Sequence, residues 1–185
     1  VPETHWDQFL ETLNSRGVLA KMPLKHAVQE GQSFFKLAIR VKQELVAYNI
    51  PFNQYDMNHV GDHVNAIEFN EALDNPDSIA VDMRNYYESE VGQFKTAIIP
   101  DVETSRDLLP QVRYLLKGQE EKEVLLYCTG GIRCEKASAY LMNFGFKNVN
   151  QLQGGIIQYA HDIKEKGLES KFIGKNFVFD ERLGE

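Results

Sequence analysis

The chain of 185 residues has an ordinary hydrophobic share of 43% and is long enough for one domain, or for one domain and a smaller partner. No apolar stretch is long enough to span a membrane, no signal peptide is visible, and the 2 cysteines lie too close in sequence for a disulfide framework, so we expect a cytoplasmic protein. The formal net charge of −7, taken as a whole, argues against nucleic-acid binding.

Positive charge is nevertheless concentrated in one segment near the N-terminus. Residues 16–42 carry 6 Lys and Arg side chains against the single acid Glu30, so the segment is +5 and the remainder is −12 (−7 − 5). Two interpretations stay open: a solvated face on a small sheet, or a patch that binds a phosphate backbone. In the second case the contacts with RNA would come from Lys36, Arg40 and Lys42.

Residues 1–48 are predicted to hold one helix and one or two strands. Residues 1–15 have the apolar spacing of an amphipathic helix. In residues 35–41 large apolar side chains occupy every second position, as in a strand with one face exposed to solvent. A less regular extended piece at 24–28 is a candidate partner for that strand. So few elements cannot bury both sides of a sheet, and the chain begins with Val1 rather than Met, so we expect this unit to be incomplete.

Residues 49–63 are predicted to be a linker, because they contain Pro51 and several Asn and Asp residues without any periodicity. His59 and His63 are 4 residues apart, the spacing of two metal ligands on a helix. No third ligand follows the pattern nearby, so we expect a surface pair and no metal site.

Residues 64–170 alternate between strand and helix patterns. Short apolar runs at 78–82, 124–127 and 148–152 are typical of buried parallel strands, and helical spacing follows each of them. This order predicts an α/β domain with a parallel sheet flanked by helices. The apolar segment 171–185 is predicted to pack back onto one of the domains.

The clearest chemical signal lies between the strand at 124–127 and the helix that follows it. Two glycines there allow backbone N–H groups to turn inward, and a helix N-terminus faces the same point, so an anion is favoured at the centre. A cysteine in this place should be a good nucleophile, and an arginine adds positive charge at the rim. The residues of this loop are Cys128, Thr129, Gly130, Gly131, Ile132, Arg133 and Cys134.

The length of the loop narrows its chemistry. The spacing is Cys-x4-Arg, from Cys128 to Arg133, whereas the phosphate cradle of cysteine phosphatases is one residue longer. The shorter loop suits a smaller guest, such as the outer sulfur of a persulfide.

Two runs carry a resemblance to a known family. Tyr-Cys-Thr-Gly-Gly-Ile-Arg-Cys-Glu-Lys, over 127–136, resembles the active-site loop of rhodanese domains, and more closely that of the bacterial tRNA uridine(34) hydroxylases. Gly-Lys-Asn-Phe-Val-Phe-Asp-Glu-Arg, over 174–182, resembles a segment that follows the rhodanese domain in the same family. Asp82 and Arg84 resemble an Asp-x-Arg pair that braces the rhodanese sheet, but Gln93 stands where histidine is usual.

The resemblance implies a partial ferredoxin-like domain at 1–48 and a rhodanese-like domain at 64–170. It also implies oxygen-dependent 5-hydroxylation of the wobble uridine in the anticodon loop of tRNA, with Cys128 essential and Arg133 assisting. Molecular oxygen is then a co-substrate, and the sequence shows no ligand set for a metal, flavin or haem. A plain sulfurtransferase with a Cys128 persulfide stays open, as does a non-catalytic binding module, and the oligomeric state is not indicated.

Overall fold

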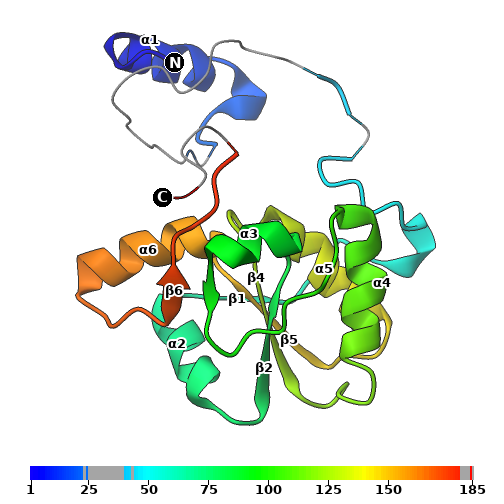
Figure 1. Ribbon diagram of the computed structural model, residues 1–185. Coiled ribbons are helices and arrows are strands. Elements are labelled where there is room, and N and C mark those ends of the chain that lie inside the picture. Colours follow the sequence, from blue (N-terminus) through cyan, green and yellow to red (C-terminus); the bar gives the residue numbers. More distant parts are fainter. Residues whose placement is uncertain (23, 25–39, 43, 180–183, 185) are drawn as a thin grey trace. The chain divides into compact units, whose positions relative to one another are not determined.

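The computed structural model describes the chain except for residues 23, 25–39, 43, 180–183 and 185, and it divides into two units, Val1–Ile39 and Arg40–Glu185 (Figure 1). The first unit contains the predicted amphipathic helix as η1 (Glu3–His5) and α1 (Trp6–Asn14), followed by η2 (Gly17–Leu19). The strands predicted at 24–28 and 35–41 fall almost entirely outside the described residues.

The second unit is built on a parallel sheet of four strands in the order β1–β5–β4–β2. The strands are β1 (Asp62–Val64), β2 (Ser78–Asp82), β4 (Glu123–Tyr127) and β5 (Asn148–Leu152). The helices are α2 (Ala66–Asp74), α3 (Tyr86–Val91), α4 (Ser105–Leu115), α5 (Ile132–Asn143) and α6 (Gly155–Lys166). An isolated parallel bridge also joins Val81 to Ile98. The predicted α/β class is therefore confirmed.

The two faces of the sheet have separate cores because successive side chains of a strand point to opposite faces. In β4, Val124 and Leu126 belong to the cluster with α4 and α5, whereas Leu125 and Tyr127 belong to the cluster with α2 and α6. Figure 1 shows these two helix pairs on either side of the strands. Helices thus cover both faces, which explains why the strands read as continuous apolar runs.

The segment around η3 (Phe52–Gln54) packs against the α4–α5 side. Tyr48 and Ile50 are buried in that core, and the Tyr48 hydroxyl donates to the carbonyl of Arg133 at 3.0 Å. Residues 49–63, expected to form a linker, thus begin in the core and end in strand β1 of the sheet.

A separate antiparallel ribbon joins β3 (Gly92–Phe94) to β6 (Phe172–Gly174). Phe94 is fully buried, and its ring lies edge-on to those of Tyr127, Tyr159 and Phe172, with centroids 4.8–5.2 Å apart. Such edge-to-face pairs add to the area that the rings bury. The segment that follows α6 is fixed to the second unit through this ribbon.

A buried ion pair ties β2 to the ribbon. Arg84 donates to both carboxylate oxygens of Asp82 and to the carbonyl of Gly92 at 2.6 Å, and both side chains are fully buried. Burial acts to lower the pKa of Arg84, but its hydrogen bond with Asp82 and the charge of that carboxylate raise the pKa above its ordinary value. Ser89 of α3 also donates to Asp82, at 2.9 Å. Asp82 and Arg84 therefore connect the sheet, α3 and β3.

We expect Arg84→Met to lower the free energy of unfolding by about 3–5 kcal/mol, because it leaves a buried carboxylate without its counter-charge. The matched control is Lys147→Met, which removes one member of an exposed ion pair with Glu121 and should cost less than about 1 kcal/mol. Urea unfolding at neutral pH measures both. Similar losses in the two variants would contradict a supporting role for Arg84.

Candidate active site

Cys128 lies directly after β4, at the carboxyl edge of the sheet. Its sulfur accepts a hydrogen bond from the backbone N–H of Gly131 at 3.1 Å, and further hydrogen bonds come from the backbone N–H of Arg133 and the thiol of Cys134. Gly131 has a φ of +91°, in the left-handed region that favours glycine, and it caps the N-terminus of α5. The loop therefore wraps donors around one sulfur atom.

These donors make Cys128 acidic. The hydrogen bond from Cys134 is the main cause that lowers the pKa of Cys128 to about 6; burial opposes it, and the charge of Arg133 and the two backbone donors assist. The pKa of Cys134 moves the other way, well above its ordinary value, because of burial and its hydrogen bond to Cys128. Near neutral pH, Cys128 is therefore the thiolate and Cys134 keeps its proton.

Both cysteines are fully buried. A reagent can therefore reach the sulfur of Cys128 only when the segments around the loop move. Cys128 is therefore no more exposed than Cys134.

Arg133 is held by a carboxylate that sequence reasoning did not find. Its Nη1 and Nη2 donate to Oε1 and Oε2 of Glu88 at 2.6 and 2.9 Å, and Nη2 also lies 3.3 Å from the hydroxyl of Thr129. Glu88 is fully buried on α3, and the side chain of Arg133 is only 12% exposed. Burial acts to lower the pKa of Arg133, but the bonds with Glu88 raise it. Arg133 was expected to add positive charge at the rim of the loop, and the structure pairs this charge with Glu88.

A second glycine turn supports the cysteine loop from the end of β5. The N–H groups of Ile156 and Ile157 donate to the carbonyls of Cys128 and Thr129 at 3.0 and 3.2 Å. Gly155 has a φ of +68°, and a Cβ on it would lie 2.7 Å from both the nitrogen of Gly131 and the carbonyl oxygen of Thr129. Only glycine fits this approach.

The other predicted residues lie at different distances from this centre. Ile132 is 52% exposed at the start of α5, and Gly130 is half-buried in the loop. Asp82 and Arg84 lie behind it: Arg84 donates to the carbonyl of Glu88 at 3.4 Å. Arg40 and Lys42 are exposed, and Lys36 is outside the described residues.

No metal centre is formed by the side chains that the structure describes, where no cluster of three or more His, Cys, Asp or Glu residues could hold an ion. His63, considered above as a ligand, instead lies 2.7 Å from a carboxylate oxygen of Glu135. In the same described part of the chain, no helix is both long and apolar enough to cross a membrane.

Glu88, Tyr48 and Gly155 are the site residues that sequence reasoning missed. The spacing Asn85-x-x-Glu88 is that of a capping box, and at the start of α3 the Glu88 carboxylate accepts a hydrogen bond from the backbone N–H of Asn85 at 3.0 Å. That pattern indicates a helix start but not the second role of Glu88 as partner of Arg133. Gly154-Gly155 follows the strand predicted at 148–152, and its place after a parallel strand puts it at the same edge as Cys128.

A parallel sheet with an acidic cysteine in a glycine loop after its strand defines a rhodanese-type site. The model of the family "Rhodanese-like domain" matches residues 65–162, more than half of the chain, so the chain belongs to the rhodanese-like domain family.

Curated relatives match over the whole chain. A protein of Leptospira interrogans named tRNA uridine(34) hydroxylase is 50% identical over 186 residues, covering 100% of this chain and 51% of the relative. One of the same name from Hamiltonella defensa is 48% identical over 187 residues, covering 100% and 53%. The chain thus spans about half the length of the curated relatives it matches. A rhodanese-like domain from Anabaena sp., solved by NMR, is 21% identical with a TM-score of 0.47, over 60% of this chain and 78% of that one.

We expect Cys134→Ala to raise the pKa of Cys128 toward the ordinary thiol value, because it removes the donor with the largest effect. At pH 6–7 the alkylation of Cys128 should then slow markedly, since the thiolate is the nucleophile. Cys134→Ser, which keeps an O–H donor, should retain most of the rate. Labelling with iodoacetamide across a pH series, followed by mass spectrometry, measures this. An unchanged pH profile in Cys134→Ala would contradict the assignment.

We expect Gly155→Ala to displace the cysteine loop, lower the free energy of unfolding by about 1–3 kcal/mol and slow labelling of Cys128. The control is Gly118→Ala: Gly118 also has a positive φ, +83°, but nothing lies within 4 Å of the added methyl group. That variant should lose some stability yet label Cys128 normally. Equal labelling rates in the two variants would show that the close approach of Gly155 is not needed.

Proposed function

We propose that this chain contains the reactive cysteine of an oxygen-dependent tRNA uridine(34) hydroxylase, which forms 5-hydroxyuridine at the wobble position. The observation that carries the proposal is the 46–50% identity, over the whole chain, to relatives that bear this name. The thiolate of Cys128 supports it, because a site with a poised nucleophile is suited to chemistry rather than to binding alone.

Molecular oxygen is the proposed co-substrate. One oxygen atom would enter the C5–H bond of uridine, and the other would leave as water. The overall reaction therefore also requires two electrons and two protons from a reductant. A pair of thiols that is oxidised to a disulfide is a suitable class of reductant.

The proposed partner is the anticodon loop of tRNA, and its use as a substrate implies the cytoplasm. A wobble uridine lies in a single-stranded loop, so an enzyme can reach it without opening a duplex. The exposed Arg40 and Lys42, with Lys36 of the same basic segment, are proposed contacts to the RNA backbone.

A second candidate is a sulfurtransferase that passes sulfur through a persulfide on Cys128. Its specific support is the cradle of N–H and S–H donors around a single sulfur atom. Because both guanidinium nitrogens of Arg133 that face Glu88 are already bonded, the loop offers little free charge to a phosphate dianion. We therefore expect no hydrolysis of aryl phosphates.

Mass analysis of tRNA nucleosides separates the two candidates. Cells that lack the protein should lose 5-hydroxyuridine from tRNA, and it should return with the wild-type gene but not with Cys128→Ser. Lys164→Ala, an exposed change on α6, is the control and should restore it. Normal 5-hydroxyuridine in Cys128→Ser, together with loss of sulfur transfer from thiosulfate, would reject the hydroxylase in favour of the sulfurtransferase.

A further inference from the structure

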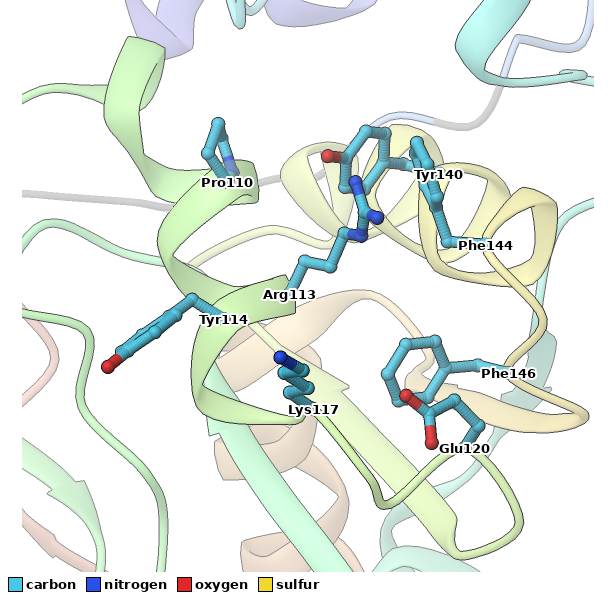
Figure 2. Close-up of a pocket in the computed structure, with 8 residues that line it drawn as sticks. All are labelled: Pro110, Arg113, Tyr114, Lys117, Glu120, Tyr140, Phe144 and Phe146. Atoms are coloured by element: carbon cyan, nitrogen blue, oxygen red, sulfur yellow. The ribbon is translucent and has the colours of Figure 1, made fainter.

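A pocket of about 450 Å³ lies between α4 and α5 on the outer surface of the second unit, and the candidate active site does not use it (Figure 2). Aromatic and basic side chains dominate its lining. The lining residues are Pro110, Arg113, Tyr114, Lys117, Glu120, Tyr140, Phe144 and Phe146.

Three of these side chains lie in contact with one another. The guanidinium carbon of Arg113 lies 3.7 Å from the centroid of the Phe144 ring, and the rings of Phe144 and Tyr140 have centroids 4.7 Å apart. Figure 2 shows Arg113 extending from α4 toward these two rings of α5. The guanidinium thus lies against an aromatic ring, and because Arg113 is exposed it is accessible to a planar ligand.

The pocket is also locally positive in an acidic chain. Within the described part of the chain, neither Arg113 nor Lys117 forms a salt bridge. Glu120, the one acid of the lining, accepts a hydrogen bond from the backbone N–H of Gly118 at 3.0 Å. Two cations against one acid give the lining a formal charge of +1, although Lys117 also interacts electrostatically with Glu120.

The position of the pocket relates it to the candidate active site. Because α4 leads into a parallel strand, it starts at the carboxyl edge of the sheet, where Cys128 lies, and runs away from that edge. Four residues share one side of α4 and its continuation, because they follow one another at spacings of 4, 3 and 4 residues. They are Arg106, Pro110, Arg113 and Lys117. Arg106 is exposed, and the helical rise places Arg113 roughly 10 Å further along.

We propose that this pocket binds an unpaired nucleotide of the substrate RNA, away from the uridine that reacts. The base stacks on the guanidinium of Arg113, and Lys117 binds its phosphate. Stacking of bases on arginine planes beside aromatic rings is a recurrent way to hold single-stranded RNA. The assignment of RNA as the ligand rests on the proposed function.

The test measures the binding of a fluorescent anticodon stem-loop RNA to this chain by anisotropy. Arg113→Ala should weaken binding about tenfold, in line with the loss of one stacked base. The control Lys164→Ala removes the same charge from an exposed site on α6 and should change binding less than twofold. Arg113→Lys should still lose most of the affinity but keep the salt dependence, because lysine retains the charge and lacks the plane.

Competitors identify the source of the nucleotide. Unlabelled single-stranded RNA should displace the probe, whereas duplex RNA of equal length should not, and free uridine monophosphate should compete only weakly. Three results would overturn the proposal that the pocket binds an unpaired nucleotide. They are an equal loss of RNA affinity in Arg113→Ala and Lys164→Ala, full RNA affinity in Arg113→Lys, and equal competition by single-stranded and duplex RNA.

The measurement of 5-hydroxyuridine keeps this result separate from the proposed function. If binding depends on Arg113 but the protein restores no 5-hydroxyuridine, the hydroxylase function is rejected and the nucleotide-binding pocket is kept. If hydroxylation depends on Cys128 but RNA binding does not change in Arg113→Ala, the hydroxylase function is kept and the nucleotide-binding pocket is rejected.

Discussion

The buried carboxylate of Glu88 fixes Arg133 with two hydrogen bonds, and the geometry of the cysteine loop depends on this pair. Arg133 lies in the first turn of α5, so fixing its side chain also fixes its backbone N–H and the neighbouring Cys134, which both bond to the sulfur of Cys128. Glu88 is in turn held by its helix cap, while Asp82 anchors α3 through Ser89. The acidity of the thiol is therefore set by contacts that reach back to the sheet.

Pairing also determines what the site can attract. Arg84 and Arg133 are each balanced by a buried carboxylate, so with the thiolate of Cys128 the centre carries a small negative charge rather than a positive one. Such a centre does not draw in phosphate groups. Any affinity for an RNA backbone must come from cations elsewhere on the chain, and Arg113 and Lys117 are exposed and without salt bridges in the described residues.

The sequence predicted those parts of the fold that local pattern controls. The runs at 78–82 and 148–152 match β2 and β5 residue for residue. The three-residue strands β1 and β3 were not foreseen, because so short a strand has no periodicity and exists only through its partner. Glu88 was missed for a similar reason: it meets Arg133 across 45 residues of sequence. Only the fold brings such residues together.

One helix links the two sites. The N-terminal turn of α5 supplies donors to Cys128, whereas Tyr140 and Phe144 near its other end form the wall of the pocket. Arg133 and Phe144 are 11 residues apart, a rise of roughly 16 Å along a helix, which is about twice the screening length at physiological salt. The wall of the pocket and the cysteine loop therefore lie at opposite ends of α5. Because α5 spans both sites, it would fix the spacing between the nucleotide proposed to bind in the pocket and the uridine proposed to react at Cys128.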